Sequence, residues 1–305
     1  MMKIFDLGIA YKWEYDVDFV SLVEKHLQEA GLSTYVIHQN NVLEVKEDLL
    51  QKKLAFNCYI DRAWDVDDRF EEIGKILQRR KTKIFNPYKN ALHAIDKASM
   101  HLEFITAGLN VPYSIIIPPH SQKEDILLSV DDLAILGRPF IIKPCNTTGG
   151  GIGVVTGAES LKEVVNERIA YTNDKYLIQE KIYPNIIDGK RAWFRCFWVF
   201  GKVIAVLWDD QTHVYEELNE ELKTKINVKK LNQITKTIYG LIQLDFFSTE
   251  IVFTNDNKFV VIDYVNDQCD MRLKSKHVDG VPDGIVNQII SYLIKAIIKS
   301  KNELS

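Results

Sequence analysis

The chain has 305 residues, of which 46% are hydrophobic and 26% are charged, and its formal net charge is -4. Such a composition is typical of a globular protein with room for two or three hydrophobic cores, and it argues against extensive disorder. Basic residues are scattered along the sequence, so we expect no nucleic-acid partner. The N-terminus lacks a basic segment followed by an apolar one, and no apolar run reaches the roughly 18 residues that cross a bilayer. We therefore expect a cytoplasmic protein with no membrane partner.

The four cysteines lie far apart and form no C-x-x-C pair, which argues against a zinc site or a disulfide framework. Cys58 and Cys196 lie in apolar runs and are expected to fill buried strand positions. Cys145 and Cys269 lie beside the candidate site described below, but neither has an activating base nearby in the sequence. A catalytic cysteine is therefore not expected.

The first 92 residues alternate between apolar runs typical of strands and longer segments with helical periodicity. This alternation indicates βαβ units around a parallel sheet, so residues 1–92 are expected to form an α/β domain. Gly31 is expected to end the first helix, and Asp65 or Asp67 to cap the third. The predicted strands cover residues 3–10, 33–38, 56–63 and 83–86, and the predicted helices cover residues 17–31, 43–53 and 67–80.

Asn86-Pro87 breaks this pattern, and residues 93–184 are expected to form a small α+β unit. Two short helices follow the proline, the second over residues 95–108. The strands of this unit alternate in polarity, as in an antiparallel sheet. Its other predicted elements are strands over residues 111–119 and 175–182 and helices over residues 124–133 and 160–172.

Residues 185–305 contain two predicted hairpins. The first covers residues 192–208 and is expected to carry its aromatic side chains on one face. A charged helical stretch over residues 216–242 separates it from the second, which covers residues 244–267. The last segment, 282–299, is amphipathic and should dock on the core. Its apolar positions are Ile285, Ile289, Ile290, Leu293 and Ile297.

The segment 138–155 carries the clearest functional signal. An apolar strand ends in Lys143-Pro144, and a polar loop with four glycines follows. Glycines at this density let backbone N–H groups converge on an anion, and Lys143 would add a positive charge beside them. The lysine precedes the loop, unlike that of a P-loop, and no helix opens at the glycines, as a dinucleotide fingerprint requires. We predict a phosphate site; the alternative is a flexible hairpin connection.

Glu250 and Asp263 lie on opposite arms of the second hairpin, where strand pairing could bring them together, and each interrupts an apolar run. Two buried carboxylates in one apolar sheet imply a cation or a basic partner. Mg²⁺ prefers oxygen ligands, and the amide oxygen of Asn266 fits the same shell. We predict a magnesium site. The alternative is that Glu250 pairs with an arginine or lysine on a neighbouring strand and Asp263 caps a turn.

In this order and at roughly this spacing, these pieces resemble the ATP-grasp superfamily, whose members include D-alanine:D-alanine ligase, glutathione synthetase and the ribosomal-protein glutamate ligases. The resemblance covers nearly the whole chain. It implies an α/β fold in which an N-terminal pre-domain is followed by two α+β lobes that clasp ATP, here residues 93–184 and 185–305. Lys97, which on its own is explained as a solvated helix residue, resembles the first ATP lysine, near the α-phosphate. Lys143 resembles the second.

The resemblance also implies roles for other residues. Arg195 resembles the arginine that faces the reacting phosphoryl group, and Glu250, Asp263 and Asn266 resemble the metal ligands. The strand end 179–182 resembles the hinge that contacts adenine, mainly through Glu180 and Ile182. The segment 147–153 resembles the mobile loop over the β- and γ-phosphates, and Asp188 resembles the acidic ribose ligand. Beyond the two lysines, the implied nucleotide-binding residues are Thr147, Thr148, Gly149, Gly150, Gly151, Gln179, Glu180, Lys181, Ile182 and Asp188.

Two positions depart from the family pattern. The metal hairpin usually ends in Glu-x-Asn, which puts both side chains on one strand face. Here it reads Asp263-Tyr264-Val265-Asn266, so a bulge or a strand end is needed to bring Asn266 round. Many members carry a further arginine after the first hairpin, where this chain has Trp208-Asp209-Asp210. These departures bear on the number of metal ions and on the acceptor site.

The activity that the resemblance implies is that of an ADP-forming ligase, which uses ATP and Mg²⁺ to join a carboxylate to an amine through an acylphosphate. The substrates are expected to be small molecules, with amino acids or peptides among them. A small-molecule kinase and a nucleotide-binding protein without turnover are the alternative functions. Relatives are often dimers or tetramers, which makes a homo-oligomer a further expectation.

The residues that follow the metal hairpin are candidates for the acceptor site. Arg272, with Asp270, would hold the substrate; a local ion pair is the alternative. Asp209 and Asp210 could recognise an amino group, and the alternative for them is a solvated turn. The implied catalytic residues are Lys143, Arg195 and Arg272.

Overall fold

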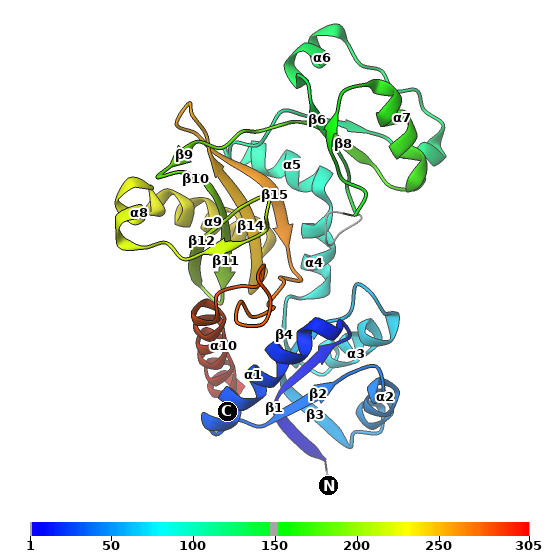
Figure 1. Ribbon diagram of the computed structural model, residues 1–305. Helices are drawn as coiled ribbons and strands as arrows, with labels where there is room; N and C mark the ends of the chain where they lie inside the picture. The colour runs from blue at the N-terminus through cyan, green and yellow to red at the C-terminus, as the bar shows by residue number, and fades with distance from the viewer. Residues whose placement is uncertain (1, 147–151, 305) are drawn as a thin grey trace.

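The computed structural model describes residues 2–146 and 152–304, which form three main sheets and one two-stranded hairpin, with helices packed against the main sheets (Figure 1). The nucleotide-binding residues predicted at Thr147, Thr148, Gly149, Gly150 and Gly151 lie outside the described residues.

The first sheet is parallel, with strand order β2-β1-β3-β4. Its strands are β1 (Lys3–Tyr11), β2 (Thr34–Ile37), β3 (Leu54–Arg62) and β4 (Lys83–Phe85). Helices α2 (Val42–Leu50) and α3 (Asp68–Gln78) share one core with it, and α1 (Val17–Glu29) shares another with the C-terminal helix α10 (Asp283–Leu304). The predicted parallel α/β arrangement is confirmed. The short 3-10 helix η1 (Glu14–Asp16) lies between β1 and α1.

Two helix boundaries follow the predicted signals. Gly31 has φ +73°, the left-handed conformation that ends α1. The Asp67 carboxylate accepts a hydrogen bond from the Arg69 N–H at 3.1 Å and caps α3. Local sequence therefore defines where these helices stop and start.

The second sheet is antiparallel, with strand order β5-β8-β6-β7. Its strands are β5 (Ser114–Ile117), β6 (Phe140–Pro144), β7 (Val155–Ala158) and β8 (Tyr176–Glu180). Its accompanying helices are α4 (Tyr88–Ile95), α5 (Lys97–Thr106), η2 (His120–Gln122), α6 (Val130–Leu136) and α7 (Leu161–Ala170). Side chains from this sheet, α6 and α7 form a separate core. We call this sheet with α6 and α7 the small lobe, which lies apart from the first sheet in Figure 1.

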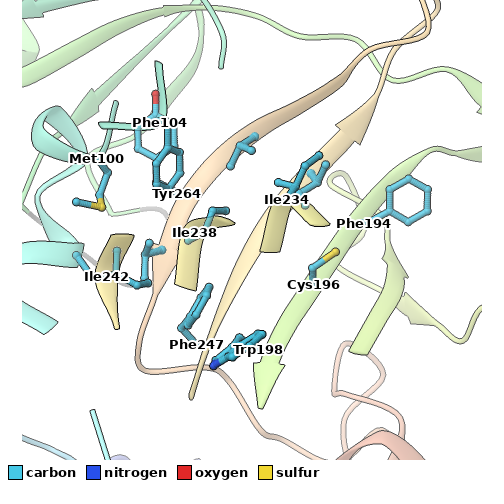
Figure 2. Close-up of a cluster of buried hydrophobic side chains, with 14 of the residues drawn as sticks. Met100, Phe104, Phe194, Cys196, Trp198, Ile234, Ile238, Ile242, Phe247 and Tyr264 are labelled. Atoms are coloured by element: carbon cyan, nitrogen blue, oxygen red, sulfur yellow. The ribbon is translucent and has the colours of Figure 1, made fainter. Parts of the chain in front are cut away.

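The third sheet is also antiparallel, with strand order β13-β12-β11-β14-β15. Its strands are β11 (Trp193–Val199), β12 (Lys202–Trp208), β13 (Tyr215–Glu216), β14 (Phe246–Phe253) and β15 (Phe259–Asn266). A separate small hairpin is formed by β9 (Ile186–Ile187) and β10 (Lys190–Arg191), and the helices between β13 and β14 are α8 (Glu220–Lys225) and α9 (Val228–Ile242). Figure 2 shows one core of this unit, to which α9 contributes Ile234, Ile238 and Ile242 and α5 contributes Met100 and Phe104.

Several element predictions were wrong in detail. The aromatic residues of the β11–β12 hairpin do not share one face: Phe194 and Trp198 join the core with α9, whereas Phe197 joins the core with α10. Both faces of β11 are buried, so large side chains suit both. The helical stretch predicted over residues 216–242 is two helices separated near Ile226, and the helix predicted over 124–133 begins at Val130. The short strands β9, β10 and β13 were not predicted.

The β14–β15 hairpin, which carries the predicted metal ligands, has shifts in its pairing register. Glu250 on β14 faces Asp263 on β15, and Ser248 faces Asn266, so three residue steps on β15 span two on β14. A second register shift follows between Glu250 and Ile251. The bulge predicted from the Asp-x-x-Asn spacing is confirmed, and the two shifts together move the pairing of β15 with β14 by two residues.

The C-terminal helix α10 connects the first and third sheets. Its residues Val286, Ile290 and Ile297 are buried in a core that also contains Leu7 from β1 and Phe197 from β11. Near its end, Lys301 forms an ion pair with Asp6 at 2.9 Å. The predicted docking of the amphipathic C-terminal segment is confirmed. Within residues 2–146 and 152–304, no helix combines the length and apolarity needed to cross a membrane.

Candidate nucleotide and metal site

Lys143 lies near the end of β6, where its side chain leaves the small lobe and meets the third sheet. It is 6% exposed, and its Nζ donates a hydrogen bond to the Ile262 carbonyl at 3.1 Å. The ammonium also lies 5.2 Å from the centre of the Tyr264 ring, within cation–π range. Burial lowers the pKa of Lys143 to about 8; Asp263 opposes this shift and the nearby Lys97 adds to it. The structure thus holds a buried cation beside the predicted metal residues.

Lys97 is the first residue of α5, and its backbone N–H donates to the Cys145 carbonyl at 3.0 Å, just beyond β6. The preceding Asp96 caps the helix by accepting hydrogen bonds from the Ala98 and Ser99 N–H groups. Its carboxylate also pairs with Lys175 at 2.8 Å. These contacts explain how Lys97 and Lys143, which are distant in the sequence, come close enough for their charges to interact.

Glu250 lies on the same face of the third sheet as Trp193 and Arg195, at the position of β14 that faces Asp263 on β15. Its buried carboxylate accepts a hydrogen bond from Trp193 Nε1 at 3.1 Å and pairs with the Arg195 guanidinium. Burial raises the pKa of Glu250, the positive Arg195 opposes the rise, and the like charge of Asp263 adds to it. The ion pair with a neighbouring strand, kept as an alternative to metal binding, is therefore present.

The Arg195 side chain is only 12% exposed, and it lies between the acidic residues and two aromatic rings. Its guanidinium carbon lies 4.5 Å from the centre of the Trp208 ring and 5.9 Å from that of Tyr215. Burial tends to lower the pKa of Arg195, but Glu250, Tyr215 and Asp263 together raise it by more than burial lowers it, so the guanidinium stays charged. Its Nε has no hydrogen-bond partner within the described part of the chain. Trp208, which begins the segment that departs from the family pattern in the sequence, packs against Arg195.

The residues predicted to bind metal fit a magnesium ion by their donor chemistry. Asp263 is half-buried, and its carboxylate accepts no hydrogen bond within residues 2–146 and 152–304. Each Glu250 oxygen retains a lone pair beyond the bond it accepts. No group of three or more His, Cys, Asp or Glu residues arranged for metal binding occurs among the described residues. Two carboxylates and the Asn266 amide oxygen suit Mg²⁺, which commonly completes its shell with phosphate oxygens and water.

In the strand end predicted to contact adenine, the side chains of Gln179 and Glu180 already bond other parts of the protein. Gln179 is buried, and its Nε2 donates to Ser114 Oγ at 3.0 Å and to the Tyr264 hydroxyl at 3.1 Å. The Glu180 carboxylate accepts from the Tyr113 N–H at 2.6 Å, and its own N–H donates to the Tyr113 carbonyl. These side chains therefore fix the position of β8 relative to neighbouring segments. A contact between this strand end and a base would have to come from the backbone or from the residues that follow Glu180.

The next two hinge residues lie beyond the end of β8. The Lys181 ammonium lies 5.9 Å from the centre of the Tyr183 ring. Ile182 packs against an apolar cluster on the third sheet formed by Trp193, Val252, Val260 and Ile262. The predicted contact of Ile182 with adenine stays a prediction.

Asp188 has φ +52° in the turn between β9 and β10, and Lys225 of α8 donates to its two carboxylate oxygens at 2.7 and 2.8 Å. This surface pair engages the carboxylate that was predicted to bind ribose. Asp188 therefore remains a prediction that would require the pair with Lys225 to open or to be shared.

The candidate acceptor residues form local ion pairs. Arg272 is held by Asp270 at 2.7 Å and Asp279 at 2.9 Å, and its guanidinium lies over the rings of Trp13 and Tyr15. The alternative of a local ion pair is thus observed for Arg272.

Asp210 pairs with Arg191, and Asp209 accepts hydrogen bonds from the Gln211 and Thr212 N–H groups in a turn. The turn that was the alternative for Asp209 and Asp210 is also observed. Neither aspartate presents an unengaged carboxylate to an amino group.

Two residues at the site were missed by sequence reasoning. Trp193 donates to Glu250, and Tyr264 lies beneath Lys143. Both are large residues in apolar strands, which made them look like ordinary core. The useful signal was their position: Tyr264 follows Asp263 directly, and Trp193 lies two residues before Arg195 on the same strand face.

Compared by sequence, the chain matches no protein-family model and no curated protein. Solved structures are similar to it over its whole length. The D-alanine–D-alanine ligase of Bacillus anthracis complexed with ATP has a TM-score of 0.67 at 14% identity, and 98% of this chain and 99% of that chain are covered. A RimK domain ATP-grasp protein from Sphaerobacter thermophilus has a TM-score of 0.62 at 16% identity, with 94% and 98% covered.

A third similar structure is the ATP-grasp ligase PsnB complexed with a precursor peptide and AMPPNP, with a TM-score of 0.61, 15% identity, and coverage of 96% of this chain and 99% of that chain. At these identities the likeness concerns the fold. The chain has the α/β fold of the ATP-grasp superfamily, as the sequence predicted.

Proposed function

We propose that the protein is an ATP- and magnesium-dependent ligase, which forms ADP and joins a carboxylate to an amine. The observation that carries the proposal is the convergence of Lys97, Lys143 and Arg195 with Glu250 and Asp263, from five separate elements, on one place between the small lobe and the third sheet. Three cations and two acids arranged around a buried edge suit a polyphosphate bound with a divalent cation. The similar structures with bound ATP, AMPPNP or ADP support this interpretation.

In the proposed reaction, a substrate carboxylate oxygen attacks the γ-phosphorus of ATP and ADP leaves. The resulting acylphosphate is opened by an amine nitrogen, which forms the amide and releases phosphate. Lys97 and Lys143 would neutralise phosphate oxygens, and Arg195 would stabilise the charge at the transferring phosphoryl group. Magnesium held by Glu250, Asp263 and Asn266 would supply charge neutralisation between phosphate groups. The protein's contribution is to position these charges and to exclude water.

The arrangement of Arg195 explains why it can serve this role while paired. Glu250 and the Trp208 ring fix the guanidinium, so little ordering remains to be done when the phosphoryl group arrives. Its Nε–H donor is left without a partner in the described part of the chain. A second acceptor at this position would satisfy that donor.

The proposal is tested in two steps with the full-length chain. ATP binding is first measured by calorimetry with and without Mg²⁺, and we expect binding that depends on the metal. A panel of carboxylic acids and amines, including amino acids and short peptides, is then assayed for ADP, free phosphate and an amide product by mass. ADP without free phosphate, together with a stable phosphoester, would indicate the kinase alternative. Absence of ATP binding would refute the proposal.

A further inference from the structure

Tyr264 lies in the part of β15 that the register shift lengthens, and it is fully buried. Its ring packs edge-on against Phe104 of α5 at 5.3 Å, and the two side chains lie together in Figure 2. Lys143 of β6 lies over the ring, and the hydroxyl contacts His101 Nδ1 at 2.7 Å and Gln179 Nε2 at 3.1 Å. One side chain of the third sheet therefore touches α5 and two strands of the small lobe.

The hydrogen bonds around this hydroxyl form a connected set. The Gln179 amide donates one hydrogen to Ser114 Oγ and the other to the Tyr264 hydroxyl, while Ser114 Oγ donates to the Pro112 carbonyl. The tyrosine hydroxyl has a single proton, and we assign it to the bond with His101 Nδ1. In this assignment His101 is neutral, with its proton on Nε2. Burial, together with the charge of Lys143, lowers the pKa of His101 to about 4, in agreement with this assignment.

The contacts of Tyr264 and Lys143 connect the small lobe to the third sheet. Gln179 and Lys143 belong to the small-lobe sheet, whereas Tyr264 and the Ile262 carbonyl belong to the third sheet. The ring and the carbonyl are the two contacts that the third sheet offers to the Lys143 ammonium. If the ring turned or β15 shifted, both contacts would change together.

We propose that Tyr264 is a positioning residue, whose hydrogen-bonded hydroxyl fixes the ring beneath Lys143 and so sets the ammonium where a nucleotide phosphate would meet it. The proposal rests on the proposed function, because it concerns the lysine of the same site. Because side chains alternate along a strand, Asp263 faces Glu250 while Tyr264 points into the core on the opposite side of the sheet.

The test is a double-mutant cycle on ATP affinity, measured by calorimetry in the presence of Mg²⁺. Tyr264→Phe keeps the ring but removes the hydroxyl, and we expect it to weaken ATP binding at least fivefold. In a Lys143→Met background the same substitution should have no further effect, because the group it positions is gone. Equal losses in both backgrounds, or no loss in the parent background, would overturn the proposal.

Tyr59→Phe is the matched control. Tyr59 is also fully buried, and its hydroxyl donates to Asp61 at 3.0 Å in the first sheet, away from the site. The Tyr59→Phe substitution should lower thermal stability without changing ATP affinity. If Tyr59→Phe weakens ATP as much as Tyr264→Phe does, the effect is general destabilisation and the assignment of Tyr264 is wrong.

A second variant keeps the test decisive if Tyr264→Phe does not fold. His101→Leu removes the acceptor of the hydroxyl while leaving the tyrosine in place. We expect it to weaken ATP binding in the parent background and to have no further effect in the Lys143→Met background. Equal losses in both backgrounds, or no loss in the parent background, would overturn the proposal. A parent chain that does not bind ATP refutes the proposed function and this inference together. A parent that binds ATP, with variants that bind equally well, refutes only the inference.

Discussion

Arg195 and Glu250 face each other on the adjacent strands β11 and β14 and form a buried ion pair within the candidate site. The pair satisfies part of the hydrogen-bonding capacity of the carboxylate without exhausting it, since each carboxylate oxygen can accept more than one hydrogen bond or metal bond. Metal binding and ion pairing at Glu250 are therefore compatible. Asp263 lies on β15, the other neighbour of β14, and adds a second negative charge that Arg195 alone does not offset.

We predict different outcomes for the two acidic residues when each is replaced by its amide. Glu250→Gln leaves the Arg195 guanidinium buried without its counterion, which should reduce stability by about 3–5 kcal/mol. Asp263→Asn removes a half-buried carboxylate that makes no hydrogen bond in the described part of the chain, so stability should change by less than about 1 kcal/mol. Urea denaturation measures both.

Both variants should also lose the dependence of ATP binding on Mg²⁺. Calorimetric titrations at several metal concentrations provide the measurement. Retention of the full magnesium dependence by Asp263→Asn would show that this hairpin does not hold the metal.

Removal of the Lys143 ammonium should weaken ATP binding. Hydrogen bonds to charged groups contribute about 1.5–3 kcal/mol, so Lys143→Met is expected to reduce affinity about tenfold to a hundredfold. The matched control is Lys162→Met on α7, where the side chain is exposed and belongs to the same lobe. An equal loss in both variants would mean that net charge, rather than the site, determines binding.

The lowered pKa of Lys143 predicts a pH dependence. Because the folded-state pKa is about 8, the ammonium loses its proton as pH rises above that value, and ATP affinity should fall over the same range. The unfolded chain holds this proton up to a higher pH, so the stability of the nucleotide-free protein should rise between about pH 8 and pH 10. In Lys143→Met both trends should disappear. Parallel pH titrations of parent and variant, by calorimetry and by urea denaturation, check this.

Gly280 allows a close approach of two backbone segments. A Cβ at this position would lie 2.6 Å from the Leu273 carbonyl carbon and oxygen, which cannot move without disrupting the loop that holds Arg272. We expect Gly280→Ala to destabilise the protein by about 1–3 kcal/mol.

Gly240 supplies the control for this substitution. It lies exposed in α9 with no atom near the position of its missing Cβ, so Gly240→Ala should stabilise the protein by about 0.5–1 kcal/mol. Thermal denaturation of the two variants distinguishes the cases. Equal melting temperatures would contradict the close packing at Gly280.

Sequence reasoning succeeded where the determinants are local. The alternation of apolar runs and helical periods predicted the parallel sheet, and the spacing between Asp263 and Asn266 predicted the bulge in β15. These features depend on neighbouring residues and on backbone periodicity. The same reasoning placed Lys143 and Glu250 together through the resemblance to a known fold.

Sequence reasoning failed where a feature depends on residues that are far apart in the chain. That Arg195 is the partner of Glu250 depends on β11 lying beside β14, which no local pattern reveals. The aromatic residues of β11 were assigned to one face because the helix that buries the other face, α10, comes almost a hundred residues later. The ion pair between Asp188 and Lys225 likewise depends on how α8 folds against the β9–β10 turn.

The placement of α10 also bears on how the chain can be divided. This last helix seals apolar faces on both the first and the third sheets, so the initial segment of the chain completes its interior only with residues supplied by the final segment. A fragment that stops after residue 92 would leave Leu7, Ile9 and Cys58 with the cover of α1 but without that of α10. On a ribosome, the first sheet would acquire its full cover only after α10 had been synthesised.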